Sequence, residues 1–416
     1  MAEPITSSAD VVSSEDPREI FGAILDPAQR GDLYPLYHRL REIAPVHPTE
    51  QLKNERAWVL TRHRDIDAVL RNRDMLSDRR NLAIFDTGAS GELFFDMMTR
   101  LLLYLDRPDH DRVRNLVSQA FTPRSVDARR ERIQQAVNQL LDRAADVGHM
   151  DLVPDFAYPL PITVICEMMG VPSEDLPRFF GWAHDFARRG DVSDVTDERI
   201  RAGEDATRGF DGYFLEHIRD RRRRPRQDLI TALVEARDGG KGLSDDEIVA
   251  TCVILLQAGH ETTADLIGMG TLHLLEHPEQ LALLRREPDR IAAAGEELLR
   301  FDSSVQISQR VGPHDVELSG VTIPAGEVCV IINGAANRDP EVFAEPDRLD
   351  IERDASDHRT FGLGRHHCLG ASLARAEIRT ALRTLVTRFP DLALDGEAVY
   401  RPSLFLRGLA TLPVRL

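Results

Sequence analysis

A helical pattern of more than thirty residues, from Ser244 to Glu276, constrains the fold of this chain more than any other feature. Its start carries a capping box, because Ser244 is followed three residues later by Glu247. It ends at His277, since the proline that follows disfavours helical backbone at the residue before it. Apolar side chains occur on most faces around 253–256, which is typical of a buried helix. We therefore expect this helix to run through the core of a mainly helical protein.

Helical periodicity extends over most of the chain, from 108 to 388, with turn sequences between the segments. Shorter helices are predicted at 34–43 and 64–71. The first twenty residues are rich in small and acidic side chains, so we expect 1–20 to be a disordered extension. The remainder, 21–416, has neither internal repeats nor a low-complexity linker and is predicted to be one domain.

Strand patterns are few and short. They occur at 57–61, in an insert that spans 315–332, and at 404–416. We therefore predict a mainly α fold with small peripheral β-sheets. The stretch 77–105 has irregular patterning, and a long irregular segment inside a compact domain is usually functional or mobile.

Charge and composition exclude several classes of protein. The net charge of −17 argues against nucleic acid as a partner. We find neither an apolar run long enough to cross a bilayer nor the features of a signal peptide, so we expect a cytoplasmic protein without a membrane partner. Four cysteines lie far apart and form neither a disulfide framework nor a CxxC metal site: Cys166, Cys252, Cys329 and Cys368.

Cys368 lies in a glycine-rich segment, Phe361–Gly370, directly before a long helical pattern. A thiol at a helix N-terminus beside cations is expected to have a lowered pKa, because the helix dipole and the positive charges favour the thiolate. Thiolate is the form that binds a metal or a haem iron. The commoner fate of a single cysteine is a buried structural position, and that alternative stays open from this segment alone.

A second segment, Ala258–Thr263, interrupts the central helical pattern with a glycine and two threonines, which are poor helix formers. A threonine here could bond back to a preceding carbonyl and open the helix. The segment is then either a packing kink or a groove for a small ligand. In the second case Glu261 and Thr262 could relay protons as an acid and a hydroxyl.

Two charged pairs have helical spacing. Glu297 and Arg300 lie three residues apart, and His110 and Arg114 lie one turn apart. Each pair is by itself typical of an exposed helix face, where it would contribute little stability.

Together, these segments resemble the cytochrome P-450 monooxygenases of the soluble bacterial type, from about Tyr34 to the C-terminus. The segment around Cys368 matches the haem-binding loop of that family, and Ala258–Thr263 matches its oxygen-activation motif. Further matches are the Glu-x-x-Arg pair, a meander from Asn337 to Pro346, and a closing β-hairpin formed by 407–409 and 412–414. The chain departs from the family at Arg107 and at Ser304, where proline is usual.

The resemblance implies a cytochrome P-450 fold with a long central helix over haem b, whose iron takes the Cys368 thiolate as axial ligand. Glu261 and Thr262 are implied to be the catalytic residues that deliver protons to bound O2, and Glu297 with Arg300 a buried structural pair. The remaining residues implied to bind the cofactor are His110, Arg114, Ala258, Gly259, Arg310, Phe361, His366 and Gly370.

The substrate is less constrained. The resemblance assigns a pocket to 79–103 and 179–190, and a mostly apolar lining implies a lipophilic small molecule. Gln257 and Gln306 could hold a substrate oxygen by their amides, or they could bond only backbone or water. The residues expected to contact substrate are Ile254, Gln257, Val305, Gln306, Ile307 and Phe405, with 404–406 as a whole.

The chain carries neither flavin nor iron–sulfur motifs, so its electrons are expected to come from a ferredoxin and its reductase. Arg112 and Arg365 are predicted to contribute to a basic docking patch. The predicted reaction is hydroxylation or epoxidation of a polyketide, a terpenoid or steroid, or a fatty-acid-like substrate, typical of secondary metabolism. A peroxide-using peroxygenase and a non-catalytic haem-binding protein remain as alternatives.

Overall fold

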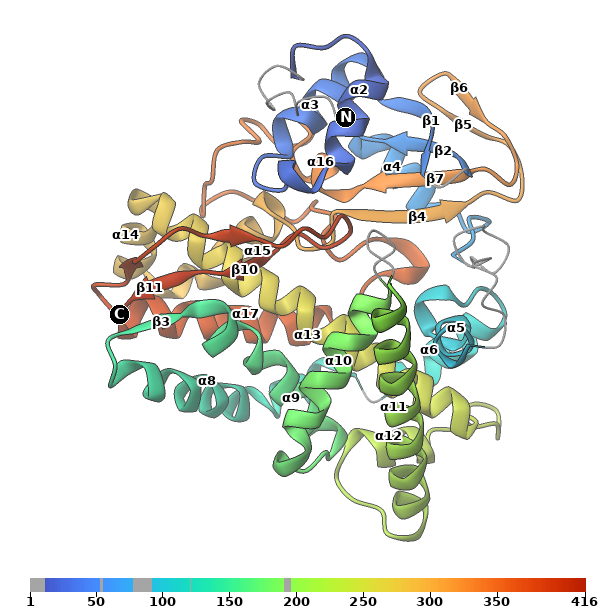
Figure 1. Ribbon diagram of the computed structural model, residues 1–416, viewed down its shortest axis with the longest axis vertical. Coiled ribbons are helices and arrows are strands. Elements are labelled where there is room, and N and C mark those ends of the chain that lie inside the picture. The colour runs from blue at the N-terminus through green and yellow to red at the C-terminus, as the bar shows by residue number, and fades with distance from the viewer. Residues whose placement is uncertain (1–11, 53–54, 78–91, 120, 191–195) are drawn as a thin grey trace.

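The computed structural model describes residues 12–52, 55–77, 92–119, 121–190 and 196–416. Helices form most of the molecule, and a small sheet with its own covering helices lies at one end (Figure 1). The helices are α2 (Pro17–Leu25), α3 (Tyr34–Ile43), α4 (His63–Arg71), α5 (Leu93–Arg100), α6 (Asp109–Ser118), α7 (Pro123–Asp127), α8 (Arg130–Ala145), α9 (Pro159–Met169), α10 (Leu176–Gly190), α11 (Asp197–Arg223), α12 (Leu229–Glu235), α13 (Asp245–Glu276), α14 (Pro278–Arg286), α15 (Ile291–Phe301), α16 (Asn333–Asn337) and α17 (Ala371–Arg388). Short helical turns are η1 (Pro27–Gln29), η2 (Leu102–Tyr104), η3 (Val153–Ala157), η4 (Ser173–Asp175), η5 (Pro288–Arg290) and η6 (Gly364–His366).

The strands form four small sheets in the described chain. The largest has the order β1-β2-β7-β4, in which β2 and β7 are parallel and the other pairs are antiparallel. The strands are β1 (Val46–Leu52), β2 (Glu55–Leu60), β3 (His149–Asp151), β4 (Ile307–Val311), β5 (Val316–Leu318), β6 (Val321–Ile323), β7 (Val328–Ile332), β8 (Ala393–Leu394), β9 (Val399–Tyr400), β10 (Leu409–Thr411) and β11 (Pro413–Arg415). The prediction of a mainly α fold with peripheral sheets is confirmed.

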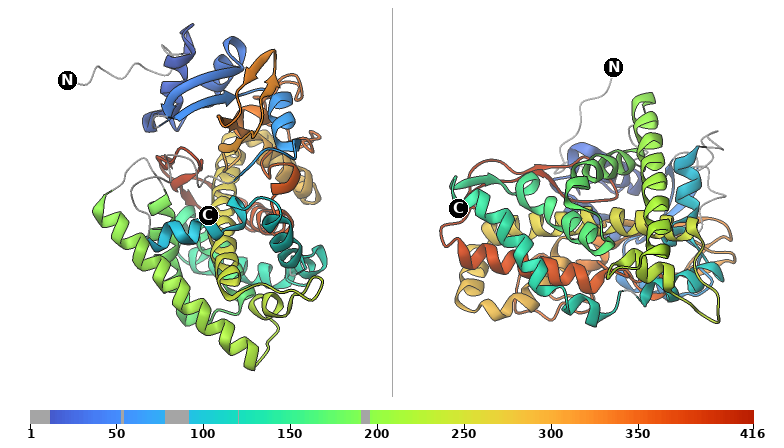
Figure 2. Two further views of the ribbon diagram at one scale, coloured as in Figure 1. Left: turned by 90° about the vertical axis from the view of Figure 1, so that its right-hand side faces the viewer. Right: turned by 90° about the horizontal axis from the view of Figure 1, so that it is seen from below.

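Helix α13 is the axis of the helical part, and it crosses the middle of the molecule in all views (Figures 1 and 2). It is 32 residues long and begins with the predicted capping box, in which Ser244 and Glu247 bond each other reciprocally. Helices α9, α11, α15 and α17 pack around it. Because most of its side chains are buried in the main hydrophobic core, the apolar pattern on most faces has the predicted cause.

Strand β7 explains why a continuous apolar run can form a strand. Its side chains alternate between two separate cores: Val330 and Ile332 pack with α2 and α3, whereas Cys329 and Ile331 pack with α4. Both faces of the sheet are therefore covered, and each of the five β7 residues is buried.

Several element boundaries differ from the predictions. Helix α3 has the predicted bounds, and α4 begins one residue earlier. The disorder predicted for 1–20 is wrong after residue 16, because α2 begins at Pro17 with Asp16 as its cap and buries Ile20 and Phe21. Residues 1–11 lie outside the described part.

Two further corrections concern the region 77–105 and the C-terminus. Within the predicted irregular stretch, 93–100 forms helix α5, because Phe94 and Met97 face the core on one side of a helix. Residues 78–91 lie outside the described part. The predicted closing hairpin is also wrong, since β10 pairs with β9 whereas β11 pairs with β3 and β8. Among the described residues, no helix is long and apolar enough to span a membrane.

Candidate active site

Cys368 is held in a tight loop between η6 and α17. Its backbone N–H donates to the carbonyl oxygen of Phe361 at 2.9 Å, which closes the loop. Gly362 and Gly364 have φ angles of +66° and +70°, where side chains with a Cβ are strained. A Cβ on Gly364 would also collide with the carbonyl oxygen of Leu70 at the end of α4. The two glycines thus allow the loop to pack closely against α4 in the conformation that positions the Cys368 thiol.

The electrostatics of Cys368 differ from the sequence prediction. Burial raises the pKa of its thiol, and a backbone hydrogen bond from Gly370 and the charges of Arg114 and Arg375 only partly oppose this effect. The predicted lowering of the pKa in the protein alone is therefore wrong, because desolvation outweighs the helix terminus and the cations. Cys368 is partly exposed nonetheless, unlike the other three cysteines, and a metal cation at the sulfur would favour the thiolate outright.

An open face lies in the middle of α13. Ala258 is exposed and Ile254, Glu261 and Thr262 are partly exposed, although the helix is buried before this segment, at 248–253, and after it, at 263–274. These residues have the spacing of one helix face. A Cβ added to Gly259 would meet no atom of the described chain within 4 Å. Exposed side chains at the centre of a core helix indicate a space beside it that protein atoms do not fill.

Glu261 and Thr262 border this space. The hydroxyl of Thr262 donates to the carbonyl oxygen of Ala258 at 2.8 Å, as expected for a threonine that bonds back. The expected opening of the helix is not observed, since α13 is continuous from Asp245 to Glu276. The Glu261 carboxylate lies 3.6 Å from a guanidinium nitrogen of Arg401, a partner that sequence reasoning missed.

His110 and His366 form the second part of the site. Their ring centroids are 4.4 Å apart, although His110 lies on α6 and His366 on η6. The Nε2 atoms of both rings are buried and have no hydrogen-bond partner in the described chain. Burial lowers the pKa of both imidazoles, in the case of His366 to about 4. Buried polar atoms without partners are costly, which indicates that a polar group of a ligand belongs here.

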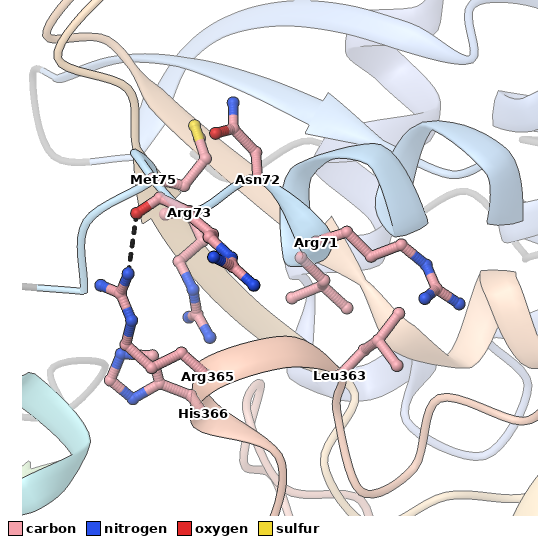
Figure 3. Close-up of a pocket in the computed structure, with 9 residues that line it drawn as sticks. Arg71, Asn72, Arg73, Met75, Leu363, Arg365 and His366 are labelled. Atoms are coloured by element: carbon pink, nitrogen blue, oxygen red, sulfur yellow. Dashed lines mark hydrogen bonds between the residues drawn. The ribbon is translucent and has the colours of Figure 1, made fainter. Parts of the chain in front are cut away.

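Positive charge surrounds the two histidines. Arg114 donates to the carbonyl oxygen of His367 at 2.6 Å. Arg310 projects from β4, and with Arg365 and His366 it lines a small cavity at the edge of the loop (Figure 3). Arg365 closes one side of this cavity by donating to the carbonyl oxygen of Arg73 at 2.9 Å. The region is therefore suited to the carboxylates of a ligand.

Charged side chains of α15 and α17 support the Cys368 loop. Glu297 and Arg300 are fully buried and paired, and Arg300 also donates to the carbonyl oxygens of Asn337 and Pro346 at 2.9 Å. The pair therefore contacts both ends of the meander. Sequence reasoning missed Arg375, whose guanidinium lies 4.4 Å from the ring centre of Phe361 and donates twice to Glu296 at 2.8 Å. Its only signal was its place on the helix that follows Cys368.

The expected substrate residues divide into two groups. Val305 bridges to Leu406, and the backbone N–H of Gln306 donates to the carbonyl oxygen of Phe405 at 2.9 Å, so the two segments lie side by side. Val305 and Phe405 are partly exposed, as are Ile254 and Gln257 on α13. By contrast, Ile307 packs in the core beneath the sheet.

The amides of the two glutamines have protein partners. Gln306 is 1% exposed, donates to the carbonyl oxygen of Ser303 at 2.6 Å and accepts from the hydroxyl of Tyr37 at 3.0 Å. The expectation that Gln306 offers its amide to substrate is thereby corrected. Gln257 donates one N–H of its amide to the carbonyl oxygen of Ala183 on α10 at 3.3 Å.

The two arginines predicted for partner docking are also engaged within the protein. Arg112 forms hydrogen bonds to Glu247 at the start of α13. The side chain of Arg365 is 15% exposed and lies 3.7 Å from Asp111. Because each of these arginines lies beside a carboxylate, each adds less net positive charge to a docking surface than an unpaired arginine would.

The donor set fits a haem. A partly exposed thiol, an open helix face and two buried imidazole nitrogens without hydrogen-bond partners among the described residues match the three needs of that group: a thiolate ligand, room for a planar ring, and partners for its two propionates. The fold and the site define a haem-thiolate protein.

Known proteins agree with this class. The family described as Cytochrome P450 matches residues 196–402. Cytochrome P450 CYP107DY1 of Priestia megaterium is 41% identical over 86% of this chain and 89% of its own. 6-Deoxyerythronolide B hydroxylase of Saccharopolyspora erythraea is 40% identical over 92% and 96%. A crystal structure of P450BioI with a hexadec-9Z-enoic acid ligated acyl carrier protein superposes with a TM-score of 0.88 at 36% identity, covering 94% and 99%. The chain belongs to the cytochrome P450 family, and it is a haem-thiolate monooxygenase.

Proposed function

We propose that this enzyme hydroxylates or epoxidises a lipophilic small molecule with O2, using haem b and electrons from a ferredoxin and its reductase in the cytoplasm. The observation that carries this proposal is the open face of α13, where Ala258, Glu261 and Thr262 share one uncovered side of a helix that is buried before and after this segment. When bound, the haem with its thiolate ligand supplies the oxidising chemistry. The protein must position the reactants and supply protons.

The proposed proton path uses two adjacent side chains. Glu261 is 14% exposed, so its carboxylate can exchange protons with solvent. Thr262 directs its own proton to the Ala258 carbonyl, and its oxygen therefore offers lone pairs to a proton donor in the open space. In this arrangement the Thr262 oxygen would hold a water molecule in place by accepting its hydrogen bond, and Glu261 would resupply protons from solvent.

The proposed cofactor contacts follow from charge and from unpaired groups. Cys368 would provide the thiolate ligand, and Gly370 donates a backbone hydrogen bond to its sulfur. The unpartnered Nε2 atoms of His110 and His366, protonated for this role, would hold the propionates together with the charges of Arg114 and Arg310. Ala258 and Gly259 leave room above the ring, and Phe361, covered by Arg375, shields the sulfur side.

For the substrate we propose a polyketide, a terpenoid or steroid, or a fatty-acid-like molecule. The supporting observations are the partly exposed apolar side chains of Ile254, Val305 and Phe405, and the relatives that act on 6-deoxyerythronolide B or bind a hexadecenoic acyl group. The Gln257 amide nitrogen donates one of its two N–H groups to Ala183. Its second N–H can donate and its oxygen can accept, so we propose that this amide binds a hydroxyl or a ketone group of the substrate.

Spectral titration tests this contact. Gln257→Leu should weaken binding of lipophilic alcohols and ketones by about 2- to 10-fold, which is the worth of one hydrogen bond, and should leave matched hydrocarbons without an oxygen unchanged. Unchanged binding of the alcohols and ketones would remove Gln257 from the proposed pocket.

The reaction itself is tested by reconstitution. We expect turnover with NADPH, a ferredoxin and its reductase, and slower reduction at high salt, because exposed charges steer the partner. Glu261→Gln and Thr262→Ala should divert electrons from product to hydrogen peroxide. Turnover with peroxide but not with the electron-transfer proteins would instead establish a peroxygenase. The lack of a spectral response across the whole library would favour non-catalytic haem binding.

A further inference from the structure

We infer that Arg401 is a positioning residue for Glu261, and that Asp265 and Ser304 hold Arg401 in place for this task. The inference deepens the proposed function, because it rests on Glu261 as the residue that supplies protons. It concerns a cluster that joins the central helix to the C-terminal segment, far apart in the sequence.

The guanidinium of Arg401 lies beside two carboxylates, those of Glu261 and Asp265. Glu261 and Asp265 are four residues apart on α13, so their side chains lie on the same face. Arg401 follows β9 and lies opposite them, fixed by a backbone hydrogen bond from its N–H to the carbonyl oxygen of Gly408 at 2.9 Å. Its two terminal nitrogens reach one carboxylate each: Nη2 lies 2.5 Å from Asp265, and Nη1 lies 3.6 Å from Glu261.

The two contacts differ in kind. The contact to Asp265 is a short charge-assisted hydrogen bond, whereas the distance to Glu261 is too long for a hydrogen bond and leaves only attraction between charges. A carboxylate held in this way can turn away and return without breaking a directional bond. Arg401 thus keeps Glu261 beside Thr262 and leaves it able to move.

The carboxylate of Asp265 is the most constrained group of the cluster. Its side chain is 4% exposed, and its second oxygen accepts a hydrogen bond from the hydroxyl of Ser304 at 2.7 Å. Gly408 packs so closely against Asp265 that a Cβ there would collide with the carboxylate. With both oxygens bonded and the side chain enclosed, Asp265 cannot follow Glu261 when that residue moves.

Ser304 stands where the family usually has proline. Proline carries no hydroxyl group that could donate to Asp265. The departure therefore has a structural use in this chain: Ser304 bonds Asp265, Asp265 bonds Arg401, and Arg401 attracts Glu261. The buried Nε of Arg401 has no partner among the described residues, so the guanidinium depends on these carboxylates for its position.

The inference is tested first without turnover, by double-mutant cycles on unfolding of the protein. Replacements Arg401→Gln, Asp265→Asn and Glu261→Gln are combined in pairs. We expect coupling of Arg401 with Asp265 to change the unfolding equilibrium constant by about 10-fold or more, and coupling of Arg401 with Glu261 to change it by less than about 5-fold. The reverse order of these couplings would overturn the inference.

The second test measures how electrons divide between product and hydrogen peroxide. Arg401→Gln should lower the share that reaches product by about 5-fold and enlarge the solvent isotope effect, while the substrate concentration for half-maximal spectral shift stays within about 2-fold. Arg401→Lys should restore part of the loss. Arg383→Gln, on the exposed side of α17, is the matched control and should have no effect.

The outcomes separate this inference from the proposed function. If Glu261→Gln itself leaves the division of electrons unchanged, the proposed role of Glu261 fails and the inference fails with it. If Glu261→Gln changes the division but Arg401→Gln does not, only the inference fails. An Arg401→Gln effect that adds fully to that of Glu261→Gln also overturns it. Ser304→Ala is the milder variant should Arg401→Gln not fold, and it is expected to show the same effects at reduced size.

Discussion

Glu297 and Arg300 form a bidentate ion pair in which neither side chain is exposed to solvent. The two hydrogen bonds measure 2.7 and 2.8 Å, and Glu297 also accepts from the backbone N–H of Asp350 at 3.0 Å. The pair thus ties α15 to the meander behind the Cys368 loop. Glu297 also pairs with Arg353 at 3.2 Å, whereas the other hydrogen-bond partners of Arg300 in the described chain are backbone carbonyls, so removal of Glu297 would leave the Arg300 charge buried without a carboxylate.

Glu297→Gln is therefore expected to destabilise the protein by about 3–5 kcal/mol, the usual cost of breaking a buried pair. Denaturant unfolding of the haem-loaded protein measures the change. The exposed pair of Arg130 and Asp127 is the control, and Asp127→Asn should cost at most about 1 kcal/mol. Similar losses for the two variants would show that burial of the Glu297 pair is not what stabilises it.

Gly364 offers a test of the loop geometry. Gly364→Ala places a Cβ at a φ of +70° and against the carbonyl oxygen of Leu70, so the loop must shift and haem retention should fall. Gly148→Ala is the matched control, because its φ is +82° but a Cβ there meets no described atom within 4 Å. It should cost only the backbone strain, about 1–2 kcal/mol, and keep full haem content. Haem content per protein, measured by absorbance, separates the two variants.

Cys368 is expected to be the only cysteine needed for thiolate ligation. Cys368→Ser should abolish the strongly red-shifted Soret band of the reduced carbon monoxide complex. Cys329→Ala removes a buried thiol from β7 and should keep that band. A Cys368→Ser protein that is folded, loaded with haem and still shows the band would contradict the assignment of the axial ligand.

His273 should make stability depend on pH. Burial lowers the pKa of this imidazole, but hydrogen bonds to Asp302 at 3.0 Å and Glu276 at 3.1 Å outweigh burial and raise the pKa above its ordinary value. A raised pKa in the folded state favours folding below about pH 6.5, and this contribution is lost as the pH rises through the folded pKa.

The loss of stability in His273→Gln, relative to the natural chain, is therefore expected to be larger at pH 6 than at pH 9. Unfolding midpoints at the two values measure it. His149→Gln is the control, since His149 is exposed, and its effect should not vary with pH. A loss that grows toward pH 9 would mean that the neutral ring is the stabilising form.

Much of the candidate site could be predicted because its elements are local in the sequence. The capping box of α13, the glycines around Cys368 and the spacing of Glu297 and Arg300 each depend on residues within one or two turns of each other. Local backbone preferences and helix periodicity suffice for such features. The resemblance to a family then assigned His110 and Arg310 to the same cofactor.

Other parts could not be predicted because they depend on contacts between distant segments. Arg401 and Asp265 are 136 positions apart, and no local pattern links them. The same holds for the pairing of β10 with β9 instead of β11, which is decided by the surfaces that meet when the helices pack.

By itself, the sequence determined the helical architecture, the buried course of α13 and the position of the thiol, because these follow from periodicity and from glycine conformation. Only the tertiary structure decided the state of that thiol, since its pKa depends on desolvation and on Arg114 and Arg375, which the fold brings near. Tertiary structure likewise decided that the amide of Gln306 bonds Ser303, that Gln257 donates to Ala183, and that Glu261 faces Arg401. Burial and long-range contacts set these properties, and neither can be read from neighbouring residues.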